Sequence, residues 1–260
     1  GIGDMVTVGE MSSTSLEHCI RYTDPAEHEL SMCFSFHHLK VDYKNGNKWE
    51  LAKPDYRRLK ELLMTWQRKM AEHNGWNALF WCNHDQPRIV SRLGDTDRYW
   101  KESAKMLGTC IHLLRGTPYI FQGEELGMTN PGYNKIEEYW DVESINYYHI
   151  MLQEGKTEEE ALEVLRQRSR DNGRSPMQWN SGEYAGFTDR EPWIGIPANH
   201  TFINVEDEEG DPDSILNYYR KLTALRKRYP TIQEGMIQLL YEAQEEVFAY
   251  RRTRNGQELI

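Results

Sequence analysis

The feature that most constrains this sequence is a regular alternation of short apolar runs with longer helix-like segments. The strand candidates are residues 5–8, 29–36, 77–81 and 119–121. The segments between them carry apolar residues at helical spacing or helix start and stop signals, and predict helices at residues 12–23, 54–73 and 99–114. Strand and helix repeated in this order predict parallel β/α units.

The predicted architecture is the C-terminal half of a (β/α)8 barrel, followed by the start of a small antiparallel β domain. A doubly wound open sheet is the alternative, but no Gly-x-Gly-x-x-Gly follows the first strand. Two more helical segments are expected at 141–170, broken near 154–156, and at 213–229. We assign residues 1–229 to the barrel and 230–260 to the β domain. Both ends of the chain look cut, because each lies close to a strand pattern.

The composition excludes several classes of partner. The formal net charge is −10, which argues against nucleic acid and anionic membranes. No run approaches the roughly 20 apolar residues of a membrane span. Four cysteines show no C-x-x-C pairing, and free thiols suit a reducing cytoplasm.

Polar residues follow each predicted strand, where barrel enzymes carry their chemistry. The first strand is followed by Glu10, the second by His37-His38-Leu39-Lys40, the third by Asn83-His84-Asp85-Gln86-Pro87-Arg88 and the fourth by Gln122-Gly123-Glu124-Glu125. Two facing carboxylates suit acid/base work on a glycosidic bond.

Each of these polar residues also has a plainer structural interpretation. Glu10 alone could be a loop carboxylate, and His84-Asp85 a hydrogen-bonded turn. Glu124 and Glu125 are expected to be structural salt-bridge partners. His37 and His38 could bind a metal only if adjacent residues faced the same way, which a strand forbids. The sequence therefore predicts no metal site and no cofactor.

Four stretches resemble glycoside hydrolase family 13 of the α-amylase superfamily. Residues 7–10 (Thr-Val-Gly-Glu) resemble its acid/base region and residues 83–88 the region of its third essential carboxylate. Residues 123–128 are similar to the end of its eighth barrel strand, and residues 171–179 to the signature of the oligo-1,6-glucosidase branch. Within that branch, residues 9–15 and 34–40 look most like the trehalose-6-phosphate hydrolases.

The resemblance implies a retaining double displacement. By motif, Glu10 is the general acid/base and Asp85 the transition-state stabiliser that hydrogen-bonds sugar hydroxyls. His84 would contact the same sugar. Arg88 and Arg174 are candidates to position substrate or a neighbouring carboxylate.

The family's nucleophilic Asp would precede residue 1. The 260 residues therefore hold two of the three catalytic carboxylates, and half a barrel leaves two open sheet edges. We expect the isolated chain to be inactive.

A phosphorylated disaccharide requires a basic pocket. Lys40, Lys44 and Lys48 lie in the loop after the second strand, and lysine binds phosphate as a point charge. Lys40 and Lys48 are the predicted ligands, with Lys40 preferred because it lies nearest the strand end. A solvated charged loop at residues 42–48 is the plain alternative.

Three other functions are alternatives to hydrolysis of a phosphorylated disaccharide. The nearest alternative function is that of an oligo-1,6-glucosidase or of a sucrose-cleaving relative. A non-catalytic partner or transporter subunit with this fold is disfavoured because Glu10, His84 and Asp85 occur together. A metal-dependent hydrolase would need converging His and Asp ligands.

Overall fold

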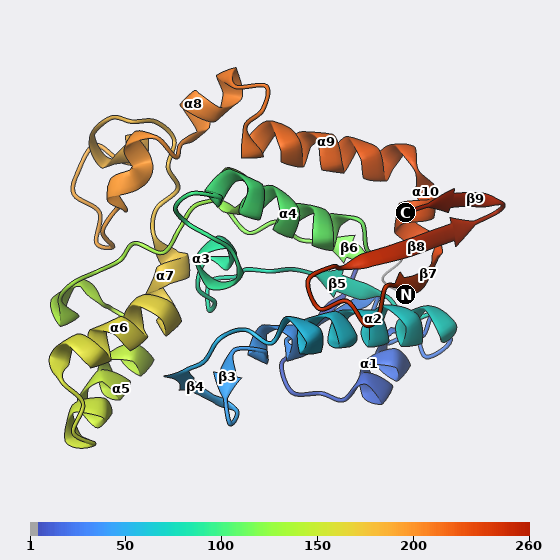
Figure 1. Cartoon of the computed structure of the whole chain (residues 1–260), viewed down its shortest axis with the longest axis horizontal. Helices are drawn as coiled ribbons and strands as arrows, with labels where there is room; N and C mark the ends of the chain where they lie inside the picture. The colour runs from blue at the N-terminus through green and yellow to red at the C-terminus, as the bar shows by residue number, and fades with distance from the viewer. Residues whose placement is uncertain (1–4) are drawn as a thin grey trace.

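The protein is built on a four-stranded parallel sheet whose strands are each followed by helical structure (Figure 1). The computed structural model describes residues 5–260. The sheet order is β1-β2-β5-β6, so strands that follow one another along the barrel are neighbours in space. Its strands are β1 (Val8–Met11), β2 (Met32–Ser35), β5 (Asn77–Leu79) and β6 (Thr117–Pro118). A short hairpin, β3 (Tyr43–Lys44) and β4 (Asn47–Leu51), fills the loop after β2.

The helices surround this sheet and its loops (Figure 1). The α-helices are α1 (Leu16–Thr23), α2 (Tyr56–Glu72), α3 (Ile89–Leu93), α4 (Trp100–His112), α5 (Val142–Gln153), α6 (Glu158–Arg168), α7 (Asp171–Arg174), α8 (Val205–Gly210), α9 (Ile215–Arg228) and α10 (Pro230–Glu234). The 3₁₀ turns are η1 (His37–Lys40), η2 (Glu124–Leu126), η3 (Ile136–Glu138), η4 (Glu183–Gly186) and η5 (Ala198–Thr201).

Local capping explains where the predicted helices begin. Ser15 rather than Ser12 or Ser13 caps α1, and its hydroxyl accepts from the His18 amide. Asp55 caps α2, so Pro54 lies just before the helix instead of in its first turn. The predicted break between α5 and α6 is confirmed, and Thr157 and Glu160 form the expected capping box.

The four parallel strands differ from the predicted ranges because strand pairing, not residue type, decides their ends. Of the predicted 29–36 and 77–81, β2 keeps residues 32–35 and β5 residues 77–79. The apolar run at residues 5–8 is not a strand throughout, since β1 begins at Val8, where it meets Met32 of β2. The fourth strand was expected at residues 119–121 but pairs with β5 only through Thr117 and Pro118. Strands β1 and β6 end the sheet, so the predicted open edges are present within residues 5–260.

The main core lies between the sheet and the helices α2, α4 and α9. Phe80 and Trp81 continue β5 into this core, and the Trp81 indole donates to the Leu107 carbonyl of α4 over 2.8 Å. Tyr219 of α9 closes the opposite side, and α4 lacks a side chain at Gly108 where this ring packs. The barrel-type packing thus fixes the loops that leave β5 and β6.

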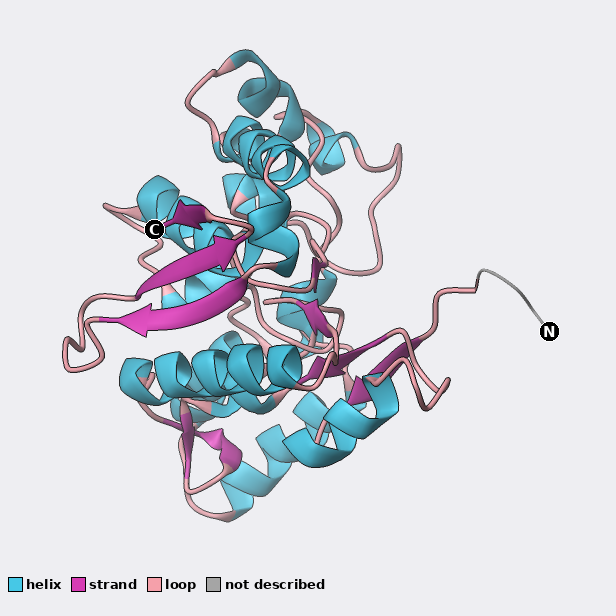
Figure 2. Cartoon of the chain, turned by 90° about the vertical axis from the view of Figure 1, so that its right-hand side faces the viewer, coloured by secondary structure: helices cyan, strands magenta, loops and turns pink. Residues whose placement is uncertain are grey.

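A three-stranded antiparallel sheet follows the barrel helices, as predicted for the last part of the chain. Its strands are β7 (Met236–Leu240), β8 (Ala249–Arg254) and β9 (Gln257–Leu259). Figure 2 shows these C-terminal strands lying apart from the parallel sheet. The ammonium of buried Lys60 of α2 lies within hydrogen-bond distance of four carbonyls between residues 241 and 247 and ties the two parts together. The division into domains at residues 229 and 230 stays a prediction.

Two sequence expectations concern what the described part of the chain contains. None of the helices within residues 5–260 is both long and apolar enough to cross a membrane. Residues 1–4, which were assigned to the barrel with the rest of 1–229, lie outside the described residues.

Candidate active site

Glu10 lies on β1 and points away from the buried side of the strand. Gly9 before it is buried against Leu30, whereas Glu10 is exposed, in keeping with the alternation of faces along a strand. Glu10 is in register with Phe34 of β2, which in turn pairs with Ala78 of β5. Because the three strands are parallel, the segments that follow them leave from the same edge of the sheet.

Asp85 lies in the loop that follows β5 and is held by three neighbours. Its amide donates to the Asn83 side chain over 2.8 Å, and its Oδ1 accepts from Nη2 of Arg174 over 2.9 Å. Nε2 of His84 lies 3.6 Å from Oδ2, and the His84 side chain is 68% exposed. The loop thus brings together the predicted sugar-binding residues His84 and Asp85 and leaves them accessible.

Arg174 acts on the backbone as well as on the carboxylate. Its Nε donates to the His84 carbonyl over 2.8 Å, so one guanidinium fixes both residues of the His84-Asp85 pair. Of the two roles that the sequence suggested, positioning a neighbouring carboxylate is the one that this geometry supports.

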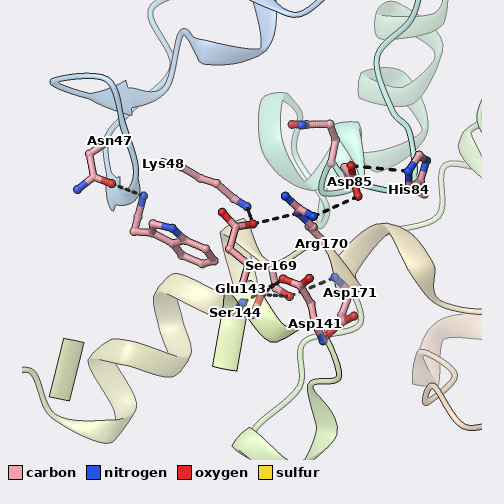
Figure 3. Close-up of polar contacts among 12 residues, drawn as sticks. Asn47, Lys48, His84, Asp85, Asp141, Glu143, Ser144, Ser169, Arg170 and Asp171 are labelled. Carbon is pink, nitrogen blue, oxygen red and sulfur yellow. Dashed lines mark hydrogen bonds and ion pairs between the residues drawn. The ribbon is translucent and has the colours of Figure 1, made fainter. Parts of the chain in front are cut away.

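Figure 3 shows that Asp85 also belongs to a longer series of ion-paired side chains. Nη1 of Arg170 lies 3.8 Å from Oδ1 of Asp85, and its Nε lies 2.9 Å from Oε2 of Glu143. The same Glu143 oxygen accepts from Lys48 over 2.8 Å. Sequence reasoning missed Arg170 and Glu143; the only signal was that Arg170 directly precedes the 171–179 stretch.

Arg88 is a correction to the predicted site. Its side chain is 1% exposed, and its guanidinium donates to the Gln122 carbonyl and to the carbonyl and hydroxyl of Ser175. Arg88 therefore connects the loop after β5 to the segments after β6 through a buried side chain. A side chain this deeply buried does not fit a direct contact with substrate.

The two predicted phosphate ligands have different surroundings. Nζ of Lys40 is exposed and donates to the Ser12 carbonyl over 3.1 Å, which places this cation next to the end of β1. Lys48 is paired with Glu143 and lies 4.5 Å from the centre of the Trp49 ring. Burial lowers the pKa of Lys48, and the pairing with Glu143 offsets this only in part. Lys40 is therefore more accessible to a phosphate group than Lys48.

The histidine pair is tied to the backbone. Nε2 of His37 lies 3.0 Å from the Thr14 carbonyl, and Nε2 of buried His38 lies 2.8 Å from the Phe80 carbonyl. Burial lowers the pKa of His38 to about 4. Residues 5–260 contain no cluster of three or more His, Cys, Asp or Glu side chains arranged to hold a metal ion.

Glu124 is structural, but not through an ion pair as predicted. Its carboxyl is buried and accepts from the Tyr219 hydroxyl over 3.2 Å, and no basic side chain in the described part of the chain forms a salt bridge with it. Burial raises its pKa to about 8.

The parallel strands, each followed by helical structure and by polar side chains, place this chain in the α/β-barrel class. The family model for the α-amylase catalytic domain matches residues 2–235, and the chain belongs to this family.

The relatives of this chain include trehalose-6-phosphate hydrolases and oligo-1,6-glucosidases. It is 51% identical over 257 residues to trehalose-6-phosphate hydrolase of Bacillus subtilis (strain 168), covering 99% of this chain and 46% of that protein. It is 48% identical to the probable oligo-1,6-glucosidase 2 of the same strain, with the same coverage. The crystal structure of a mutant of Bacillus licheniformis trehalose-6-phosphate hydrolase, in complex with PNG, superposes with a TM-score of 0.96 at 56% identity, over 98% of this chain and 46% of that one. The chain spans about half the length of the relatives it matches.

Proposed function

We propose that these residues are part of a retaining α-glucoside hydrolase that cleaves α,α-trehalose 6-phosphate to glucose and glucose 6-phosphate. The observation that carries the proposal is the Asp85 carboxylate, fixed by Arg174 beside an exposed His84, in a segment that leaves the sheet at the same edge as Glu10. The trehalose-6-phosphate hydrolases among the relatives support the substrate class.

In the proposed reaction Glu10 protonates the leaving oxygen and later takes a proton from the attacking water. Asp85 accepts hydrogen bonds from hydroxyls of the glucosyl ring. Arg174 holds the Asp85 carboxylate in one orientation, so these bonds need no rearrangement as the ring gains positive charge. The carboxylate that forms the glycosyl intermediate is, by the family resemblance, outside residues 1–260, and we expect these residues alone to give no cleavage.

Lys40 is the proposed phosphate ligand. Its ammonium lies against the Ser12 carbonyl, two residues beyond Glu10, and is exposed. A phosphate on the second sugar could then reach Lys40 while the glycosidic oxygen lies at Glu10. Free thiols at all four cysteines agree with a cytoplasmic enzyme of trehalose catabolism.

The role of Glu10 is tested by Glu10→Gln in the full-length enzyme. We expect kcat/KM on trehalose 6-phosphate to fall by about 10²- to 10⁴-fold, the range of a lost general acid. Release of p-nitrophenol from p-nitrophenyl α-glucoside in the first turnover should fall far less, because this leaving group needs little protonation. Glu17→Gln on α1 is the control. Equal losses with both leaving groups would contradict the assignment.

The substrate is tested by Lys40→Ala with Lys44→Ala as its matched control. Both lysines are exposed and belong to the same segment. Removing Lys40 should reduce kcat/KM on trehalose 6-phosphate by about tenfold or more, as expected for a lost charge-assisted hydrogen bond. Activity on isomaltose, a neutral α-1,6-glucoside, should stay within about twofold. Isomaltose cleaved faster than trehalose 6-phosphate by the unaltered enzyme would favour the oligo-1,6-glucosidase alternative.

A further inference from the structure

An acidic residue that the sequence did not single out, Glu143, lies between two cations next to the candidate active site. Glu143 belongs to the first turn of α5, a helix capped by Asp141. Its Oε2 lies 2.8 Å from Nζ of Lys48 and 2.9 Å from Nε of Arg170. Figure 3 shows the carboxylate between these cations, with Asp85 on the far side of Arg170. One carboxylate oxygen therefore links strand β4 to the residue that precedes α7.

The contact with Glu143 decides where the guanidinium of Arg170 lies. Its Nη1 is 3.8 Å from Oδ1 of Asp85, too far for a hydrogen bond, whereas Arg174 donates to the same oxygen over 2.9 Å. Arg170 is thus a second cation beside Asp85 that leaves lone pairs of this carboxylate open to sugar hydroxyls. Without Glu143, the attraction between opposite charges would draw Arg170 onto Asp85 and occupy those lone pairs.

Lys48 fixes the Glu143 carboxylate from the opposite side. The Lys48 side chain is 19% exposed, and its ammonium lies 4.5 Å from the centre of the Trp49 ring. Trp49 is buried and stacks on Tyr147 of α5, with 4.6 Å between the ring centres. Partial burial strengthens an ion pair relative to one in open water. The Lys48 ammonium is therefore held against α5 by the protein's own groups.

The four charged side chains alternate in sign and end on a predicted catalytic carboxylate. We propose that Glu143 is a positioning residue of the reaction, which holds Arg170 beside Asp85 and is itself held by Lys48. The inference rests on the proposed function, in which Asp85 stabilises the transition state. Glu143 acts through Arg170 and needs no contact with substrate. Because Asp85 matters most as the sugar ring gains positive charge, misplacing Arg170 slows the reaction more than it weakens substrate binding.

The test is Glu143→Gln in the full-length enzyme, which removes the charge and keeps the shape of the side chain. We expect kcat to fall by about 10- to 100-fold, as for a group misplaced by about 1 Å, with KM within about twofold. The loss should be equal on trehalose 6-phosphate and on p-nitrophenyl α-glucoside, because both contain the glucosyl ring that Asp85 binds. Glu143→Asp keeps the carboxylate and should recover part of the loss. Glu158→Gln is the matched control, since Glu158 is exposed in the first turn of the next helix, α6.

A double-mutant cycle tests whether Glu143 acts through Arg170. In the Arg170→Gln enzyme, adding Glu143→Gln should lower kcat on p-nitrophenyl α-glucoside no further, because the group that Glu143 positions is already gone. A merely structural role of Glu143 would persist in that background. The same loss with and without Arg170 would therefore overturn the proposal.

Lys48→Met separates positioning from phosphate binding, and it decides the question if Glu143→Gln fails to fold. We expect kcat to fall by about three- to fivefold on both substrates, the effect of a lost, partly exposed ion pair. A loss confined to trehalose 6-phosphate would make Lys48 a phosphate ligand and overturn the proposal, as would a Glu143→Gln enzyme as active as Glu158→Gln. An unaltered enzyme that does not cleave trehalose 6-phosphate contradicts only the proposed substrate, because p-nitrophenyl α-glucoside still tests Glu143.

Discussion

Asp42 shows how much one buried residue can organise around a candidate site. Its side chain is 2% exposed, and its carboxylate accepts from Arg92 over 2.8 and 2.6 Å and also from Arg168. Burial raises the pKa of this carboxyl, but the two guanidiniums outweigh that effect and hold the pKa below its ordinary value. The pairs join the β3–β4 hairpin to α3 and α6.

Replacing Asp42 by Asn should therefore be strongly destabilising. Two buried guanidiniums would lose their counter-ion, and breaking a buried ion pair from one side costs about 3–5 kcal/mol. Urea unfolding at pH 7 measures the change in the free energy of unfolding. Asp189→Asn, at an exposed position, is the control and should stay within about 0.5 kcal/mol. An Asp42→Asn variant as stable as its control would contradict this account.

Single residues were also the hardest part to predict from sequence. A solvated loop at residues 42–48 was left open as the plain alternative, because nothing near Asp42 in the chain reveals that Arg92 and Arg168, 50 and 126 residues away, fold against it. Arg88 was predicted to bind substrate because of its neighbours in the chain. It adjoins Asp85 in a recognisable motif, yet its side chain points into the core. Motifs locate a residue along the chain but do not give the direction of its side chain.

At the scale of elements, the longer helices were predictable because their signals are local, whereas the short helices α3, α7, α8 and α10 were not predicted. Asp55, Thr157 and Ser214 each cap a helix through the amide three residues on, which needs no distant partner. Strand ends were less predictable, since they depend on a neighbour from elsewhere in the sequence. Thr117 and Pro118 form the ladder of β6, although the residues after them have the stronger strand character.

The segment from the end of α6 through α7 supplies three arginines that form ion pairs with three acidic side chains. Arg168 binds Asp42 before the hairpin, Arg170 reaches Glu143 of α5, and Arg174 holds Asp85 after β5. The three arginines lie within seven residues, so one short piece of chain sets the relative position of two loops and the start of α5. Arg174 belongs to the 171–179 stretch that resembles the family signature, so this stretch contributes to the site by fixing the Asp85 carboxylate.

At the scale of the whole molecule, α9 is attached to the barrel through two buried carboxyl groups. Glu124 accepts from the Tyr219 hydroxyl of α9, and Glu208 accepts from the Leu216 amide in its first turn. Burial raises the pKa of Glu124 to about 8 and that of Glu208 to about 7. Both groups therefore stay protonated in the folded protein at a pH where the unfolded chain has lost these protons.

The sign of the resulting pH dependence follows from proton binding. A carboxyl whose pKa is higher in the folded state stabilises the fold fully below its unfolded value, near about 4.3, and loses that contribution as pH rises through the folded value. Asp42 has the opposite shift, so its contribution is present above its unfolded value and is lost only in acid. Buried His38 and His112 act in the opposite sense, because their lowered pKa values remove stability as pH falls below the unfolded histidine value near 6.5. The fall caused by Glu124 and Glu208 is therefore separated from the histidine contribution above pH 6.5.

We therefore expect the free energy of unfolding to fall between pH 6.5 and pH 8, and Glu124→Gln to remove part of that fall. Each raised carboxyl contributes a slope of up to about 1.4 kcal/mol per pH unit within its window. Glutamine keeps an oxygen for the Tyr219 hydroxyl but has no proton to lose. Denaturant unfolding at pH 5, 6.5 and 8 measures the slope, with exposed Glu27→Gln as the control. If Glu124→Gln and Glu27→Gln show the same slope as the unaltered protein, then Glu124 ionises without cost and α9 is not held by a neutral carboxyl.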